Sequence, residues 1–77
     1  MNIIYSKQAV KTIKRLEAPT KKRIGQAILQ LPKGDIRPLQ SDEGFYRLRV
    51  GDWRIIYSYE EDEIYIKSIA PRGEAYK

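Results

Sequence analysis

The stretch Tyr46–Tyr57, "YRLRVGDWRIIY", constrains the fold more than any other part of the sequence. Gly51-Asp52 separates two runs of alternating side chains, and glycine in first place is typical of a two-residue type II′ hairpin turn. Such a short turn fixes the register of the two strands, so that Val50 pairs with Trp53. The other predicted pairs are Leu48 with Ile55, Tyr46 with Tyr57, Arg49 with Arg54, Arg47 with Ile56, and Phe45 with Ser58.

Paired residues of a hairpin share a face, so this register separates the side chains by chemistry. One face is apolar and aromatic and should pack on helices, while the other gathers Arg47, Arg49 and Arg54. Like charges directly opposite each other on two strands cost roughly 0.2–1 kcal/mol per pair, so the arginines require an explanation. A solvated outer face is one explanation, because two helices cover only one side of a small sheet. Anion binding is the interpretation that we favour, because arginine binds phosphate in a bidentate manner.

The rest of the chain predicts an α+β fold in a single domain over residues 1–77. Asn2–Tyr5 is predicted as a strand, and Ser6 as the N-cap of a first helix whose apolar residues recur at helical spacing up to Leu16. Pro19 suits the first turn of a second helix, which should end at Pro32. Residues 32–44 are predicted as a loop by their prolines, glycines and acidic residues.

After this loop the apolar period changes to that of strands, which predicts a three-stranded antiparallel meander packed on the helical hairpin. Its strands are expected over Phe45–Val50, Trp53–Tyr59 and about Ile64–Ile69. In the simplest register of the third strand, the neighbours are Lys67 with Ile56, Tyr65 with Ser58, and Ile69 with Arg54.

Composition narrows the class of partner. The 77 residues include 15 Lys and Arg, 10 Asp and Glu, and no Cys or His, for a net charge of +5. Disulfides and the usual zinc sites are therefore excluded, and the basic charge favours a polyanionic partner such as nucleic acid or an acidic protein segment. The apolar run that follows Asn2 is too short for a signal peptide or a membrane span, which predicts a cytoplasmic protein that does not enter a membrane.

The segment "FYRLRVGDWRIIYSYEEDEIYIKSIAPRGEAYK" resembles the C-terminal half of the RelE/ParE superfamily of bacterial and archaeal toxins. The features that carry the resemblance are the hairpin, the acidic turn, the third strand and the closing R-x-E-x-Y. The N-terminal "YSKQAVKTIKRLEAPTKKRI" is similar to the opening strand and helical hairpin of these proteins. The resemblance implies a RelE-like fold, which is related to that of small microbial ribonucleases.

The RelE-like branch implies the toxin of a type II toxin–antitoxin system, which cleaves mRNA in the ribosomal A site. Cleavage in this branch is a transesterification by the ribose 2′-OH, without metal or cofactor. The resemblance also implies neutralisation by an acidic, RelB-like antitoxin that wraps around the toxin in a hetero-oligomer. Two alternatives stay open, namely a ParE-like toxin that poisons DNA gyrase and a catalytically inactive RNA-binding relative.

The resemblance also assigns roles to residues of this chain. Arg47 and Arg49 match basic positions near the scissile phosphate, and Arg54 matches an arginine that stabilises phosphate or the transition state. Arg72 and Tyr76 match the basic and aromatic positions at the C-terminus, and complete the implied catalytic set. The residues expected to bind RNA are Lys7, Lys11, Lys14, Phe45 and Lys67. The general acid and base stay open, because the chain has no histidine and arginine keeps its proton at neutral pH.

Overall fold

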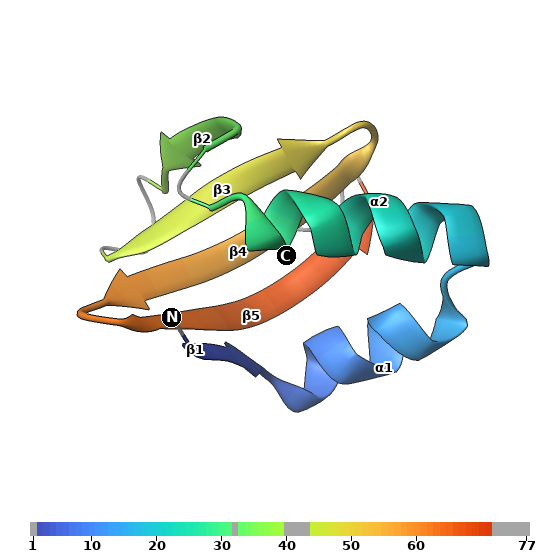
Figure 1. Cartoon of the computed structure of the whole chain (residues 1–77), viewed down its shortest axis with the longest axis horizontal. Helices are drawn as coiled ribbons and strands as arrows, with labels where there is room; N and C mark the ends of the chain where they lie inside the picture. Colours follow the sequence, from blue (N-terminus) through green and yellow to red (C-terminus); the bar gives the residue numbers. More distant parts are fainter. Residues whose placement is uncertain (1, 32, 40–43, 72–77) are drawn as a thin grey trace.

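The computed structural model describes residues 2–31, 33–39 and 44–71 as two helices packed on a five-stranded sheet (Figure 1). The helices are α1 (Lys7–Arg15) and α2 (Ala18–Leu29), and the strands are β1 (Asn2–Tyr5), β2 (Asp35–Pro38), β3 (Phe45–Val50), β4 (Trp53–Glu60) and β5 (Glu63–Pro71). The strand order is β1-β5-β4-β3-β2, with β1 parallel to β5 and all other neighbours antiparallel. The predicted α+β class is confirmed, and the predicted meander forms the centre of the larger sheet. No helix in the described ranges is long and apolar enough to cross a membrane.

Hydrogen bonds at the start of α1 fasten this helix to β5. Ser6 caps the helix as predicted: its Oγ accepts from the Ala9 N–H at 3.1 Å and donates to the Lys67 carbonyl at 2.6 Å. One turn further on, the Gln8 side chain accepts from the Ile69 N–H at 3.1 Å and donates to the Ile69 carbonyl at 3.3 Å. These contacts fix the position of the first helix along the edge of the meander.

The core lies between the two helices and the face of the sheet that they cover (Figure 1). Its largest fully buried side chains are Ile24, Ile28, Leu48, Ile55, Ile64, Ile66 and Ile69. Burial of each such side chain contributes about 1.5–3 kcal/mol relative to leaving it exposed. The apolar face of the predicted hairpin is therefore the face that packs on the helices.

Part of the predicted loop is a strand, which corrects the sequence-based assignment of residues 32–44. β2 pairs antiparallel with β3 over four residue pairs, from Asp35 with Arg49 to Pro38 with Tyr46. The segment "DIRP" is too short and too polar to show a strand period, and its pairing depends on the neighbouring β3. Pro38 is compatible with this assignment because β2 lies at the edge of the sheet.

The register between β4 and β5 contains an irregularity that the sequence analysis missed. Tyr65 pairs with Ser58 as predicted, but the register shifts between Ile56 and Tyr57, so Ile56 pairs with Ser68 and Arg54 with Ala70. The predicted neighbours Lys67 with Ile56 and Ile69 with Arg54 are therefore wrong. The extra residue in β5 has a clear physical effect: Ile66 and Ile69, an odd number of residues apart, both reach the core at 0% exposure.

Candidate functional site

The β3–β4 hairpin positions the predicted arginines as the sequence indicates. Gly51 has a φ of 60°, the left-handed conformation that glycine adopts at no steric cost, and the turn places Val50 opposite Trp53. All six predicted pairs of the hairpin are confirmed. Because Leu48, Ile55 and Tyr57 belong to the core, Arg47, Arg49 and Arg54 lie on the opposite face of the sheet, which we call the outer face.

β2 brings a further arginine to the outer face. Arg37 pairs with Arg47 across β2 and β3, and Asp35 pairs with Arg49. A guanidinium nitrogen of Arg47, Nη2, lies 3.4 Å from Asp35 Oδ1, so a carboxylate from β2 offsets part of the repulsion among the arginines. We define the arginine face as Arg37, Arg47, Arg49 and Arg54. Sequence reasoning missed Arg37 because it lies in a segment without strand periodicity.

The four members of the arginine face differ in exposure and therefore in what they can contact. Arg54 is only 7% exposed, and its Nη1 donates to the carbonyls of Gly51 and Trp53, both at 3.2 Å. The Arg47 side chain is 11% exposed and is held by Asp35. Arg37 and Arg49 are exposed. The site thus combines two anchored guanidinium groups with two accessible ones, a difference that the register of the hairpin does not predict.

Phe45 and Lys67, two of the residues expected to bind RNA, lie together in the structure. Lys67 Nζ lies 4.7 Å from the centroid of the Phe45 ring, at cation–π distance. Phe45 pairs with Ser58, which in turn pairs with Tyr65, so an aromatic strip crosses the outer face beside Arg47. Aromatic rings next to cations are the arrangement on which nucleobases stack.

Among the other predicted site residues, the three lysines of α1 lie away from the arginine face. Lys7, Lys11 and Lys14 are exposed on α1, which belongs to the helical layer on the other side of the sheet (Figure 1). Arg72 and Tyr76 lie outside the described residues. The described part of the predicted catalytic set therefore consists of the three hairpin arginines.

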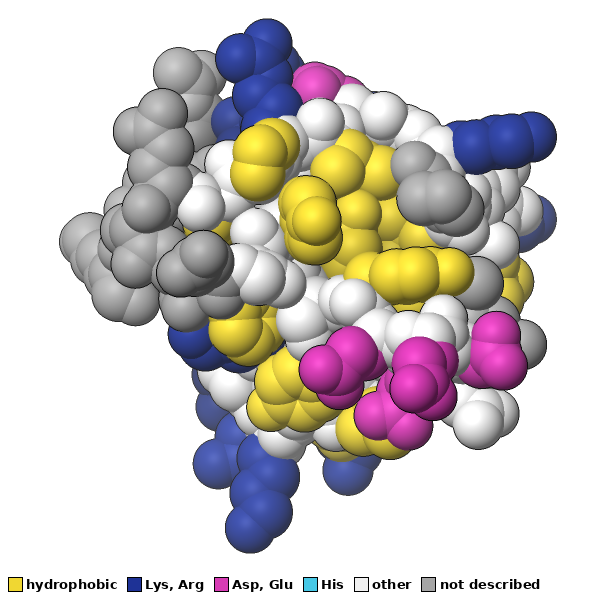
Figure 2. All heavy atoms as spheres, turned by 90° about the vertical axis from the view of Figure 1, so that its left-hand side faces the viewer, with side chains coloured by type: hydrophobic (Ala, Val, Ile, Leu, Met, Phe, Trp, Pro, Cys, Tyr) yellow, Lys and Arg dark blue, Asp and Glu magenta, His cyan; other side chains and the backbone are white. Residues whose placement is uncertain are grey.

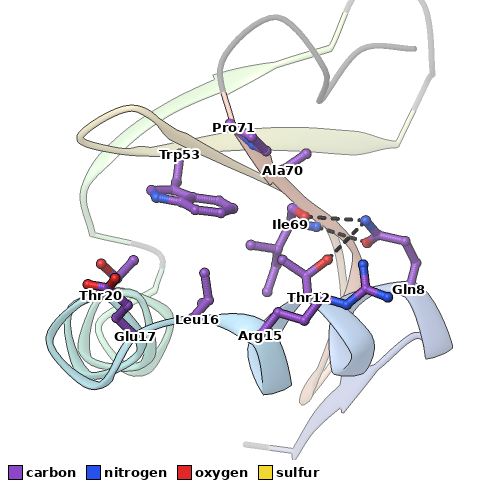
Figure 3. A pocket seen from close by; sticks show the side chains of 10 residues that line it. All are labelled: Gln8, Thr12, Arg15, Leu16, Glu17, Thr20, Trp53, Ile69, Ala70 and Pro71. Atoms are coloured by element: carbon purple, nitrogen blue, oxygen red, sulfur yellow. Dashed lines mark hydrogen bonds between the residues drawn. The ribbon is translucent and has the colours of Figure 1, made fainter.

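A hollow of about 510 Å³ lies at the Trp53 end of β4, beside the connection between the two helices (Figure 3). Its wall includes Trp53, Leu16 and Ile69, and its rim carries Arg15 and Glu17. The Gln8 amide closes one side through its hydrogen bonds to Ile69 and to the Thr12 hydroxyl. This hollow offers an apolar wall with one cation and one carboxylate, a chemistry quite different from that of the arginine face.

Comparison with known families identifies the chain at the level of its family. The family described as "ParE toxin of type II toxin-antitoxin system, parDE" matches residues 3–76. The chain belongs to this toxin family. The match confirms the membership of the RelE/ParE superfamily that the sequence led us to expect. Among curated proteins, none matches the chain significantly.

Solved structures of RelE toxins resemble this family member over nearly its whole length. A chain of the RelB–RelE antitoxin–toxin complex from Methanococcus jannaschii is 26% identical, with 95% of this chain and 94% of that chain covered and a TM-score of 0.77. A chain of the archaeal RelE–RelB complex from Pyrococcus horikoshii OT3 is 28% identical, with coverage of 96% and 97% and a TM-score of 0.73. The isolated RelE toxin of E. coli shares the fold at a TM-score of 0.76 and 14% identity, with 97% of this chain and 89% of that chain covered.

Proposed function

We propose that this toxin is a ribosome-dependent endoribonuclease that cleaves mRNA in the ribosomal A site. The observation that carries the proposal is the arginine face, where four guanidinium groups from three adjacent strands lie on one side of the sheet. Guanidinium groups bind phosphate oxygens in a bidentate manner and stabilise the charge that develops during phosphoryl transfer. The similarity of this chain to archaeal RelE chains supports the RelE-like branch of the superfamily.

The proposed reaction is a transesterification within the RNA strand. The 2′-oxygen attacks the adjacent phosphorus, the bond from phosphorus to the 5′-oxygen breaks, and the products are a 2′,3′-cyclic phosphate and a 5′-OH. One proton leaves the 2′-OH and another reaches the departing 5′-oxygen. Arg37 and Arg49 are accessible to the phosphate, while Arg47 and Arg54 are held in place by Asp35 and by the turn carbonyls.

We assign the remaining roles in this reaction to the C-terminal residues, the ribosome and the residues expected to bind RNA. Arg72 stabilises the transition state and Tyr76 contacts the substrate near the reacting atoms, as the superfamily resemblance implies. The ribosome holds the mRNA in a geometry suited to attack by the 2′-OH. Positioning of the reacting groups can by itself accelerate a reaction greatly. Phe45 and Lys67 contact the bound RNA on the outer face, and Lys7, Lys11 and Lys14 contact ribosomal RNA from α1.

An acidic, RelB-like antitoxin is the proposed cytoplasmic partner in a toxin–antitoxin hetero-oligomer. The similar archaeal RelE chains were both solved in complexes with RelB. The net charge of +5 and the arginine face favour a negatively charged segment that covers the site. Such a segment would order on binding and block access of the RNA phosphate to the arginines.

Poisoning of DNA gyrase is the second candidate function. It is favoured by one observation, which is that the matching family is the one described for toxins of parDE systems. In that case the outer face would bind a protein and would carry out no chemistry. The arginine face supports the ribonuclease, because phosphate chemistry accounts for clustered guanidinium groups and protein binding does not require them.

Primer extension on a translated mRNA after brief induction of the toxin tests the proposed function, with a ribosome-free transcript in parallel. The ribonuclease proposal expects cuts within translated codons and an intact free transcript. Intact mRNA together with growth arrest and trapped gyrase–DNA complexes would instead support gyrase poisoning. Intact mRNA with normal growth would contradict both candidates.

A further inference from the structure

A second surface lies on the helix side of the sheet, at the end of the meander away from Trp53. It is a hollow of about 330 Å³ lined by Ile36 of β2, Tyr46 of β3, and Tyr57 and Tyr59 of β4. We call it the tyrosine hollow. Its strands are those that carry the arginine face, but its side chains point to the other side of the sheet, because Tyr46 pairs with the core residue Tyr57.

The hollow is built of aromatic rings that are held in place before any partner binds. Tyr57 is 3% exposed and forms the floor, and its ring stacks on that of Tyr46 at 5.6 Å between centroids with 29° between planes. Tyr46 and Tyr59 are 37% and 44% exposed and form the walls. Exposed aromatic clusters around a hollow mark interaction sites, because such residues contribute much of the energy of an interface at a low entropy cost.

One side of the hollow carries a charge opposite to the net charge of the chain. Tyr59 is followed directly by four exposed acidic residues: Glu60 ends β4, Glu61 and Asp62 form the turn, and Glu63 begins β5. Figure 2 views this end of the molecule and shows the acidic side chains beside a patch of hydrophobic ones. A negative rim repels phosphate and attracts lysine and arginine, so the charge favours a protein segment over a nucleic acid.

We propose that the tyrosine hollow docks a protein segment that inserts an apolar or aromatic side chain between Tyr46 and Tyr59. Lysine or arginine residues next to this anchor lie against Glu61 and Asp62, at the tip of the turn that follows Tyr59. The segment is distinct from the acidic one attracted by the arginine face, and the two surfaces are on opposite sides of the sheet. Both can therefore be occupied at the same time, and the proposal does not depend on the ribonuclease activity.

Two synthetic peptides with a shared Leu-Trp-Leu centre test the proposal, one flanked by lysines and the other by glutamates. Each is titrated into the isotopically labelled full chain while amide chemical shifts are followed. We expect the lysine peptide to shift the signals of Ile36, Tyr46 and Tyr59, and to bind at the hollow at least about tenfold more tightly than the glutamate peptide, as measured from these signals. A tenfold difference corresponds to about 1.4 kcal/mol, within the range of favourable charge pairs at interfaces.

Two variants and a matched control make the test specific. Tyr59→Ser should weaken binding of the lysine peptide at least about tenfold, as expected for an interface anchor. Tyr65→Ser is the control, because Tyr65 is 37% exposed on the outer face and pairs with Ser58. The double variant Glu61→Lys, Asp62→Lys, at the tip of the turn that follows Tyr59, should reverse the preference between the two peptides while leaving the apolar hollow intact.

Four outcomes would overturn the proposal. The first is equal or tighter binding of the glutamate peptide at the hollow, and the second is the absence of shifts at the hollow with either peptide. The third is self-association of the unliganded chain that Tyr59→Ser abolishes and Tyr65→Ser does not, because the occupant would then be a second copy of the chain. Binding of the lysine peptide that Tyr65→Ser weakens as strongly as Tyr59→Ser does would also contradict it.

Discussion

Some residues of the sheet lie in electrostatically unfavourable surroundings, which the rest of the fold stabilises. The arginine face collects like charges, and Asp35 offsets only part of their repulsion through its contact with Arg47. On the other side of the sheet, the Tyr57 hydroxyl belongs to a residue that is almost fully buried next to a second tyrosine. Each of these features makes the molecule sensitive to a specific change in charge.

Burial raises the pKa of Tyr57, and the neighbouring Tyr46 raises this pKa further. The folded protein therefore disfavours the phenolate, so the contribution of Tyr57 to stability is complete below its unfolded pKa of about 10 and is lost as the pH rises above that value. Tyr57→Phe should make the free energy of unfolding less sensitive to pH between about pH 9 and about pH 11, by up to about 1.4 kcal/mol per pH unit. Burial raises the pKa of Tyr5 as well, so part of the alkaline sensitivity should remain.

Urea unfolding of wild type and Tyr57→Phe across this pH range provides the measurement. If the difference in unfolding free energy between wild type and Tyr57→Phe stays constant with pH, the raised pKa of Tyr57 is not the source of the alkaline sensitivity.

Glu61 adopts a φ of 49° in the turn between β4 and β5, a conformation that costs a residue with a Cβ atom roughly 1–2 kcal/mol. Glu61→Gly should therefore stabilise the protein by up to about 1 kcal/mol after the entropy cost of glycine, which raises the Tm by about 4–8 °C in a domain of this size. Asp62→Gly is the matched control, because it removes the same charge from the same turn. Thermal unfolding should separate the two, and an equal change in Tm would mean that charge, and not backbone strain, is responsible.

At the scale of the elements, the irregularity in β5 decides which residues reach the core. Ile66 pairs with Tyr57 and Ile69 with Ile55, and both are buried although they have opposite parity along the strand. In a regular strand, one of the two would face away from the helices. The extra residue therefore serves the core and also places Lys67 near Phe45 on the outer face.

Conservative truncation of both isoleucines tests this register. Ile66→Val and Ile69→Val should each lower the free energy of unfolding by about 0.5–1.5 kcal/mol, because each removes a buried methyl group. Ile4→Val is the control, with a side chain that is 44% exposed in β1, and should be nearly neutral. Chemical denaturation of the three variants provides the comparison. A neutral effect at either Ile66 or Ile69 would indicate a regular strand and contradict the structure.

At the scale of the whole molecule, the β3–β4 hairpin could be predicted from the sequence, whereas the strand β2 and the register of β5 could not. The register of β3 and β4 follows from two turn residues and the alternation around them, which are local in sequence. β2 and the shift in β5 depend on partners elsewhere in the chain: "DIRP" becomes a strand only beside β3, and the extra residue in β5 is needed to bury Ile66 and Ile69 together.

The candidate site follows the same division between local and tertiary information. Arg47, Arg49 and Arg54 share a face because of the hairpin, whereas Arg37 joins them through the pairing of β2 with β3. The burial of Arg54 against the turn carbonyls likewise depends on side-chain packing that the strand pattern does not specify. The tyrosine hollow, too, combines residues of three strands, one of which the sequence indicated as a loop.

We expect the arginine face to stabilise phosphate during the proposed cleavage of mRNA. The most direct test is the cleavage rate of a ribosome-bound mRNA by purified wild type and by Arg49→Ala, a substitution at an exposed position of β3. Arg15→Ala is the matched control, because it removes an exposed arginine from α1 in the helical layer. Thermal unfolding of both variants confirms that they remain folded.

Arg49→Ala should lower the cleavage rate by roughly a hundredfold, as for the loss of one group that stabilises transition-state charge, while Arg15→Ala should stay close to wild type. A wild-type rate in Arg49→Ala, or an equal loss in both variants, would contradict a specific role for the arginine face.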